Sequence, residues 1–192
     1  AHGLTHTRSF WVMRIDRPES WDTPTIPDGI TIRSMRHPEE FERVAYAAYD
    51  AFRDHYGHVE QPWEDDLKRW RHFVDNDSTF DPALFFIAVD DSNGDIAGVS
   101  LCKGIERNDP TMAIVDVLGV RRAWRKRGLG MALLQHTFQH FWQTGKNAVI
   151  LGVDADSITG ATRLYEKAGM YVERENRVYE FEFRAGKELA QG

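Results

Sequence analysis

The sequence predicts an α/β domain with a mixed central β-sheet, and two observations predict it. Short apolar runs rich in β-branched residues, typical of buried strands, alternate with longer segments whose apolar residues recur at helical spacing. The order is strand, two helices, three strands, helix, strand, helix and two strands. Strands and helices mixed in this way are typical of a sheet covered by helices.

The composition is that of one globular domain, or of one domain with an appendage. A chain of 192 residues with ordinary apolar and charged fractions can bury a core. No apolar run is long enough to cross a bilayer, so no membrane partner is expected. The single cysteine, Cys102, is interpreted as a core residue, and a cytoplasmic location is expected. The net charge of -6 argues against nucleic acid and for a cationic substrate.

Residues 1–29 are set apart from the rest of the chain. Ser9 to Ile15 has the composition of a strand, and the proline-containing stretch from Arg17 to Gly29 has that of a linker. The strand loosely resembles Val178 to Phe183. Two interpretations remain open: an extra edge strand of the same sheet, or the final strand of an upstream repeat. The main domain is placed at 30–184, with a frayed tail at 185–192.

The first half of the main domain has clear boundary signals. Pro38 suits the first position of a helix, with acidic residues in the first turn, where the helix dipole favours them. Turn-forming residues at Asp90 to Gly94 indicate a hairpin. The expected elements are a strand at Ile30–Met35, helices that begin at Pro38 and Pro62, and strands at Leu84–Val89 and Ile96–Lys103.

The second half alternates buried strands with helices. Gly169 is a natural residue to end a short helix, because glycine adopts the left-handed conformation without cost. The expected elements are strands at Val115–Val120 and Ala148–Val153, a helix at Thr159–Lys167, and closing strands at Met170–Glu173 and Val178–Phe183.

The stretch from Val115 to Trp142 carries the clearest functional signal. A buried strand runs into a basic, glycine-containing loop, which opens into a helix with one apolar face. Helix N-termini present unpaired N–H groups, and glycines at 128 and 130 let an anion approach the backbone. The loop is therefore interpreted as a site for a phosphorylated ligand.

The loop also allows other interpretations. The glycines suit a tight turn, and the bases suit a solvated surface or a nucleic-acid patch. The dinucleotide fingerprint is incomplete, and no Gly-Lys-Ser/Thr follows as in a Walker loop. The strand–loop–helix context favours the phosphate site.

At these residues the chain resembles a known family. Val120 to Gly130 resembles motif A of the GNAT N-acetyltransferase superfamily, with Arg125, Gly128 and Gly130 at its fixed positions. Leu151 to Met170 resembles motif B of that family. The resemblance implies a GNAT-like fold, a mixed sheet flanked by helices on both faces. It also suggests one half, the C-terminal one, of a tandem GNAT protein of the mycothiol synthase type.

The resemblance implies acetyl-CoA as acyl donor and no metal. The donor's pyrophosphate would lie on the backbone amides of the motif A loop, and its pantetheine arm would run beside the preceding strand. The implied cofactor-binding residues are Leu118, Gly119, Val120, Arg125, Lys126, Arg127, Gly128, Leu129, Gly130 and Ser157. Gly119 is expected to relieve crowding there.

Tyr165 is the first candidate for catalysis. In the family, the tyrosine of motif B is the acid that protonates the leaving thiolate. A phenol of pKa about 10 can donate to a thiolate whose conjugate acid has a pKa of about 8.5. The alternative is a packed aromatic side chain on a short helix.

Asp116 is the leading candidate for the general base, because it is expected to share strand parity with Leu118 and Val120. The alternatives are Glu60, His55 and His58 in the substrate-side loop, or a purely structural role for Asp116. Some relatives carry a glutamate two positions earlier, where this chain has Ile114.

Three further polar positions have blander interpretations. Ser157 stands where relatives usually have an asparagine, and is interpreted either as a cofactor contact or as the cap of the following helix. His136 and His140 stand one helical turn apart, but no third ligand is evident, so packing or surface roles are expected and no metal.

The predicted function is transfer of an acetyl group from acetyl-CoA to a primary amine, with a small molecule favoured as acceptor. The amine would attack directly in a ternary complex. The alternative is a non-catalytic CoA-binding domain of a tandem protein. Expected partners are an upstream GNAT-like domain or a homodimer. Aromatic residues that could line the acceptor pocket, or simply pack, are Tyr46, Tyr49, Tyr56, Trp63 and Trp70.

Overall fold

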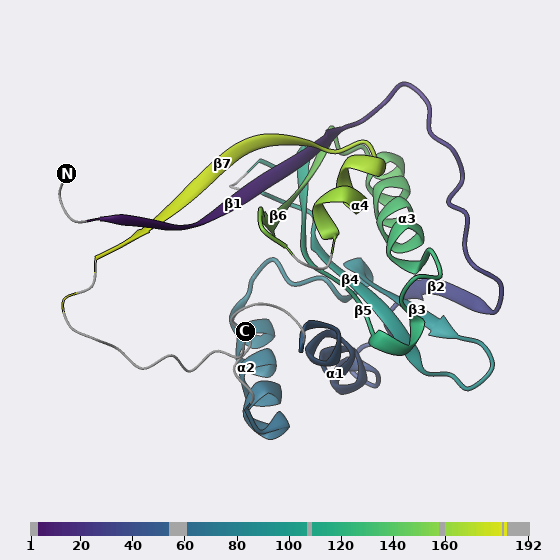
Figure 1. The fold of residues 1–192 in the computed structure, drawn as a ribbon. Coiled ribbons are helices and arrows are strands. Elements are labelled where there is room, and N and C mark those ends of the chain that lie inside the picture. Colours follow the sequence, from purple (N-terminus) through teal and green to yellow (C-terminus); the bar gives the residue numbers. More distant parts are fainter. Residues whose placement is uncertain (1–3, 54–60, 107–108, 158–159, 182, 184–192) are drawn as a thin grey trace.

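The computed structural model describes residues 4–53, 61–106, 109–157, 160–181 and 183. They form one seven-stranded sheet with helices on both faces (Figure 1). The elements are β1 (Thr5–Asp16), β2 (Ile30–Ser34), α1 (Phe41–Phe52), α2 (Trp63–Asn76), β3 (Phe85–Asp90), β4 (Ile96–Lys103), β5 (Met112–Val120), α3 (Leu129–Gln143), β6 (Ala148–Asp154), α4 (Ala161–Lys167) and β7 (Tyr171–Glu180). Single 3₁₀ turns lie at Pro82–Leu84 and Arg122–Trp124.

The sheet is mixed, as expected. Its strand order is β2-β3-β4-β5-β6-β1-β7, and every neighbouring pair is antiparallel except β5 and β6. Helix α1 packs on β4 and β5 with α2 beside it, whereas α3 and α4 cover the other face (Figure 1). Among the described residues, no helix has the length and apolarity that a membrane span requires.

The core lies on both faces of the central strands. On the α3 side, aromatic residues of α3 pack against β5, β6 and Met13 of β1. On the α1 side, small apolar residues of α1 pack against β3 and β4. Cys102 is fully buried in the first of these clusters, which confirms the expected core position.

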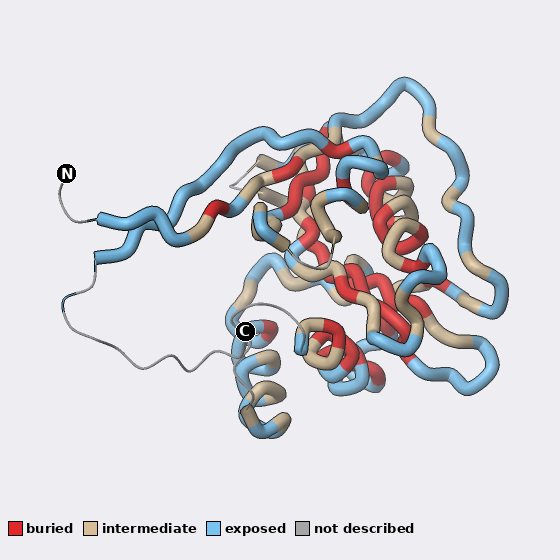
Figure 2. Tube along the Cα trace, in the orientation of Figure 1, coloured by how far each residue is buried: buried red, intermediate tan, exposed pale blue. Residues whose placement is uncertain are grey.

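β1 is not an edge strand, so the simpler of the two expectations is wrong. It lies between β6 and β7 and pairs with both, from Phe10 opposite Asp154 on one side to Thr5 opposite Glu180 on the other. Met13 is fully buried at the centre of this pairing. The outer ends of β1 and β7 extend beyond the sheet as an exposed arm (Figure 2). The upstream-repeat interpretation stays a prediction.

The chain closes with one strand instead of the two expected. β7 runs without interruption through residues 174–177, which lie between the two expected strands. β1 explains the difference, because it offers a long partner edge, and residues 174–177 pair with Val12 back to Ser9. Backbone pairing along that edge outweighs the polar composition of the segment.

Helix α1 begins at Phe41, three residues after Pro38, so the expected start was wrong. The Glu40 carboxylate accepts two hydrogen bonds from Arg33, each 2.7 Å, and one from the Arg36 N–H. The Arg33 guanidinium lowers the pKa of Glu40 to about 2. These bonds hold the acid in the turn before the helix. Helix α2, by contrast, starts beside Pro62 as expected.

Gly119 lets α1 lie close against β5. A Cβ atom at this position would stand 2.8 Å from the Ala51 Cβ and 3.0 Å from the Phe52 ring. Its lack of a side chain therefore serves helix packing. The relief of crowding beside a cofactor, expected for Gly119, stays a prediction.

We expect Gly119→Ala to destabilise the fold by roughly 1–3 kcal/mol, the usual cost of overpacking a core. Gly152→Ala is the matched control, because a Cβ atom on this glycine of β6 meets nothing within 4 Å. Urea unfolding of both variants measures the difference. Equal stability of the two would contradict the close packing at Gly119.

Candidate active site

The parallel strands β5 and β6 separate halfway along their length. They pair from Met112 opposite Ala148 to Val115 opposite Leu151, and in the described residues no pair follows. β5 nevertheless continues to Val120, paired on its other side with β4. The edge of β5 from Asp116 to Val120 is thus left without a β6 partner, so backbone groups on this edge that β4 does not engage can bind a ligand.

A β-bulge at Asp116 changes the faces of β5. Cys102 pairs with Val115 and Leu101 with Val117, so Asp116 is the extra residue. Asp116 and Val117 both line a cavity on the α2 face, whereas Leu118 packs against clusters on the α3 side. The expected shared parity of Asp116 with Leu118 and Val120 is therefore wrong.

The motif A loop presents unpaired backbone N–H groups. Among the described residues, the N–H groups from Lys126 to Met131 find no backbone acceptor, and Ala132 is the first to donate, to the Gly128 carbonyl. Gly128 caps α3 with a φ of 80°, and Lys126 has a φ of 62°. Consecutive unpaired N–H groups at a helix N-terminus form a site for an anion.

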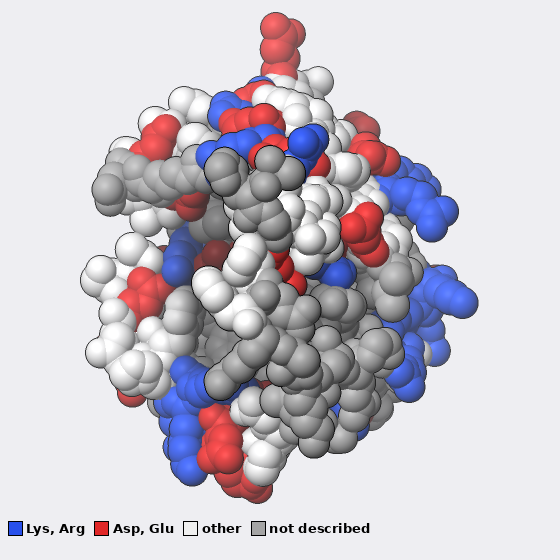
Figure 3. All heavy atoms as spheres, turned by 60° about the vertical axis from the view of Figure 1, so that its left-hand side comes forward, with Lys and Arg blue, Asp and Glu red and all other residues white. Residues whose placement is uncertain are grey.

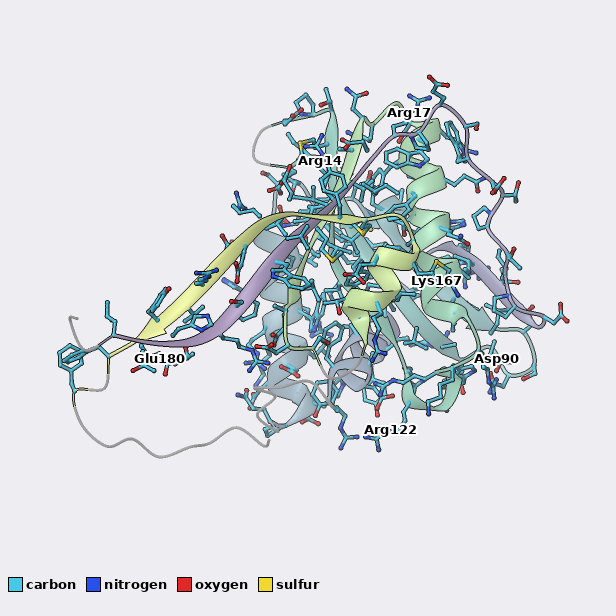
Figure 4. The ribbon with its side chains drawn as sticks, turned by 45° about the horizontal axis from the view of Figure 1, so that its top comes forward. Arg14, Arg17, Asp90, Arg122, Lys167 and Glu180 are labelled. Atoms are coloured by element: carbon cyan, nitrogen blue, oxygen red, sulfur yellow. The ribbon has the colours of Figure 1, made fainter. Side chains whose placement is uncertain are left out.

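Three side chains fix the start of this loop to the body of the domain. The Arg125 guanidinium donates to the carbonyls of Val120 and Ala51, each at 2.9 Å. The Arg121 guanidinium donates to Asp50 at 2.7 Å, and the Trp124 ring N–H donates to Asp90 at 2.8 Å. Figure 4 shows Arg122 and Asp90 at this end of the molecule. Arg125, implied as a cofactor contact, thus also links β5 to α1.

Lys126 and Arg127 are exposed in the same loop, so their charge is available to a ligand. On the face seen in Figure 3, acidic and basic side chains are interspersed. Gly130 faces α4, where a Cβ atom would stand 3.2 Å from a methyl group of Leu164. Leu129 is buried under the loop and anchors the first turn of α3.

Tyr165 packs where β5 and β6 separate. It is 7% exposed and belongs to the same cluster as Val115 and Leu151, which form the last pair of the two strands. Burial raises the pKa of the Tyr165 phenol to about 12. The phenol is therefore protonated at neutral pH and can donate a proton or a hydrogen bond.

Asp116 lies in a small network of charges. Lys103 Nζ stands 3.4 Å from Asp116 Oδ2 and 3.0 Å from Asp77 Oδ2. Asp116 is exposed at its outer side, but partial desolvation beside the sheet raises the pKa of its carboxyl group, and the Lys103 ammonium opposes that shift. Burial alone would lower the pKa of Lys103, but Asp77 and Asp116 raise it overall. A carboxylate with a raised pKa is better suited to accept a proton than an ordinary one.

Sequence reasoning missed Lys103 and Asp77. Neither lies in a motif, since Lys103 ends β4 and Asp77 follows α2. The available signal was the strand position of Lys103 in an otherwise apolar run, where a charged residue needs a partner.

The structure describes Ser157 but not the alternative candidates for the general base. Ser157 does not cap α4, because the cap residue is Gly160, with a left-handed backbone and no side-chain hydrogen bond. The capping interpretation of Ser157 is therefore wrong. The alternative bases Glu60, His55 and His58 lie outside the described residues, as does Tyr56.

His136 and His140 pack against the Phe86 ring, at centroid distances of 5.1 and 5.0 Å, which confirms the packing role. Burial lowers the pKa of both imidazoles. In the described part of the chain, no group of three or more His, Cys, Asp or Glu side chains is arranged to hold a metal ion.

The aromatic candidates divide into two groups. Tyr46, Tyr49 and Trp63 contact one another between α1 and α2, with centroids 5.2 to 6.2 Å apart. Trp70 instead lines the cavity beside Asp116. Of these candidates, therefore, Trp70 reaches the site in the described structure.

A split pair of parallel strands, an amide-lined loop at a helix N-terminus and a tyrosine at the split define an α/β ligand-binding domain with an anion site. Comparison with known proteins identifies its family. The chain belongs to the acetyltransferase (GNAT) family, whose model matches residues 44–170. The family is one of acyltransferases.

Curated relatives support this assignment. The chain is 33% identical over 172 residues to a mycothiol acetyltransferase of Thermobispora bispora, covering 87% of this chain and 55% of that protein. It is 32% identical over 176 residues to the mycothiol acetyltransferase of Nocardia farcinica, covering 87% and 54%. The chain thus spans about half the length of these relatives.

Solved structures agree on the fold. A GCN5-related N-acetyltransferase from Sphaerobacter thermophilus superposes with a TM-score of 0.81 at 34% identity, covering 98% of this chain and 56% of that one. A tandem GNAT protein from the clavulanic acid biosynthesis pathway superposes with a TM-score of 0.63 at 14% identity, covering 92% and 54%. The expected GNAT fold and the likeness to half of a tandem protein are confirmed.

Proposed function

We propose that this domain transfers an acetyl group from acetyl-CoA to a primary amine of a small molecule. One observation carries the proposal: β5 and β6 part beside Tyr165, and the unpaired edge of β5 leads to the unpaired N–H groups of the motif A loop. A ligand with a peptide-like arm and a pyrophosphate has the shape and the acceptor groups for both features.

In the proposed complex, the pyrophosphate lies on the amides from Lys126 to Gly130, with Lys126 and Arg127 beside it. The backbone of Leu118 and Val120 binds the pantetheine arm. A backbone N–H in the same segment polarises the thioester carbonyl and steadies the oxyanion. Ser157 stays a proposed contact of the donor.

The reaction is a direct acyl transfer. The neutral amine attacks the thioester carbonyl carbon, a C–N bond forms, and the C–S bond breaks. Tyr165 gives its phenolic proton to the departing thiolate, and the attacking nitrogen loses a proton to the Asp116 carboxylate. Asp116 then releases its proton to solvent, and the Tyr165 phenolate takes up a proton from solvent. The products are the amide and free CoA.

Acetyl-CoA should bind the purified chain saturably in a calorimetric titration. Arg127→Glu should weaken binding by about tenfold or more, because it reverses a charge beside the proposed pyrophosphate. Lys68→Glu, on an exposed turn of α2, is the control for net charge. We prefer Arg127 to Gly130 as the variant site, since a side chain at Gly130 would also displace Leu164 of α4.

Absence of acetyl-CoA binding by the parent chain would overturn the proposal. Binding without CoA release, for every amine in a panel, would favour the second candidate, a CoA-binding domain that does not catalyse. The observation that supports this candidate is the ion pair between Lys103 and Asp116, which engages the proposed base.

Tyr165→Phe should lower kcat by about 100-fold or more, because it removes the acid but keeps the packed ring. The KM for acetyl-CoA should stay the same. Tyr179→Phe, on the exposed arm, is the control. CoA release followed with a thiol reagent measures both variants, and an unchanged kcat in Tyr165→Phe would exclude the acid role.

Asp116→Asn should lower kcat/KM by about 100-fold or more and remove one ionisation from its pH profile. The pKa of Asp116 is raised, so activity should be lost as the pH falls, at a higher pH than for an ordinary aspartate. Asp75→Asn, an exposed α2 residue, should leave the profile unchanged. A wild-type profile in Asp116→Asn would assign the base to another group.

A further inference from the structure

A cavity of about 290 Å³ lies between α2 and the sheet. Its floor includes Asp116 and Val117, the two bulged residues of β5 that immediately follow the last β5–β6 pair. The cavity is thus adjacent along β5 to the strand separation where the acetyl group is proposed to lie. An acceptor held here would approach the thioester from the α2 face, across the sheet from α4 and Tyr165 (Figure 1).

The wall of this cavity is largely apolar and aromatic. The rings of Trp70, Phe73, Phe80 and Phe85 line it, together with Leu101 and Val117. Phe73 is 47% exposed, so one of these rings also contacts solvent. A cavity of about 150 Å³ is enough for benzene. The cavity beside α2 therefore has room for one aromatic ring and a short chain.

The charged side chains of the cavity form ion pairs with one another, although Asp77 Oδ2 accepts no hydrogen bond among the described residues. Lys103 bridges Asp77 and Asp116, and its ammonium also stands 4.9 Å from the centre of the Phe73 ring. Arg69 forms an ion pair with Asp66 one turn away on α2. A ligand with many hydroxyl groups would have to break these pairs to be recognised, whereas an apolar ligand would leave them intact.

The charge balance leaves room for one cation. Three carboxylates, of Asp66, Asp77 and Asp116, face two cationic side chains, Lys103 and Arg69. The surplus of one negative charge attracts a protonated amine, and Asp116 is the acid nearest to the strand separation along the chain.

We propose that the cavity selects the acceptor, and that the acceptor is an amine carried by a short aromatic or otherwise apolar body, the arylalkylamine class. The ring would lie among Trp70, Phe73 and Phe80, with the amine directed toward Asp116. A polyhydroxylated amine, such as an amino sugar, is disfavoured at this site. This assignment rests on the proposed acetyl transfer and specifies its substrate.

The experiment compares 2-phenylethylamine with glucosamine as acceptors for the full chain at saturating acetyl-CoA. Both carry a primary amine, so the comparison isolates the body of the acceptor. The kcat/KM for 2-phenylethylamine should be higher by about tenfold or more, since burial of a ring and loss of unmatched hydroxyls act in the same direction. CoA release measures both reactions.

Two variants test the cavity itself. Trp70→Ala and Phe73→Ser should each reduce the preference several-fold, chiefly by raising the KM for 2-phenylethylamine, with acetyl-CoA binding unchanged. Because Phe73 is partly exposed, we expect Phe73→Ser to fold even if Trp70→Ala does not fold. His72→Ala, an exposed position on the same helix, should preserve the preference.

The proposal would be overturned if kcat/KM for glucosamine equalled or exceeded that for 2-phenylethylamine. It would also be overturned if both cavity variants kept the wild-type ratio of the two values. If the chain binds acetyl-CoA but acetylates neither amine, a calorimetric titration decides, and 2-phenylethylamine must bind more tightly than glucosamine. Failure to bind acetyl-CoA at all refutes the acetyl transfer. In that case, titration of the free chain with the two amines still tests whether the cavity prefers 2-phenylethylamine. Failure of the acetyl transfer and failure of the acceptor selectivity can therefore be distinguished.

Discussion

The separation of β5 from β6 is the constraint on which the site depends. Pairing stops after Val115 and Leu151, while β4 continues to pair with β5 as far as Val120. One strand thus keeps a firm partner on one edge and offers the other edge to a ligand. The motif A loop, Tyr165 and Asp116 are each placed relative to this point by the elements that follow or flank it. A sheet paired along its full length would have no such opening.

The bulge at Asp116 divides the chemistry between the two faces of the sheet. It turns Asp116 and Val117 toward α2 and leaves Leu118 packed toward α3. The proposed acid and the proposed base therefore stand on opposite faces of the sheet, on either side of the strand segment where the thioester is proposed to bind. This arrangement suits a ternary complex, because the attacking amine and the departing thiolate each need their own proton-transfer group.

The sequence alone predicted what depends on local patterns. The mixed sheet, the strand–loop–helix of motif A and the position of Tyr165 on a short helix follow from apolar spacing and glycine placement. Long-range contacts decided the rest. The pairing of β1 with both β6 and β7, the bulge at Asp116 and the Arg125 bond to the Ala51 carbonyl join residues far apart in the chain. No pattern near Asp116 signals that Lys103 and Asp77 will stand beside it.

The place of β1 has a consequence for how the molecule is assembled. In the described residues, β7 pairs with β1 alone, and β1 must also dock against β6. β1 precedes both of its partner strands in the chain, so the loop that its pairing closes spans almost the whole domain. Closing so long a loop is entropically slow. The remainder of the sheet can form before β1 joins it, so β1 and β7 are expected to be the last strands to become native.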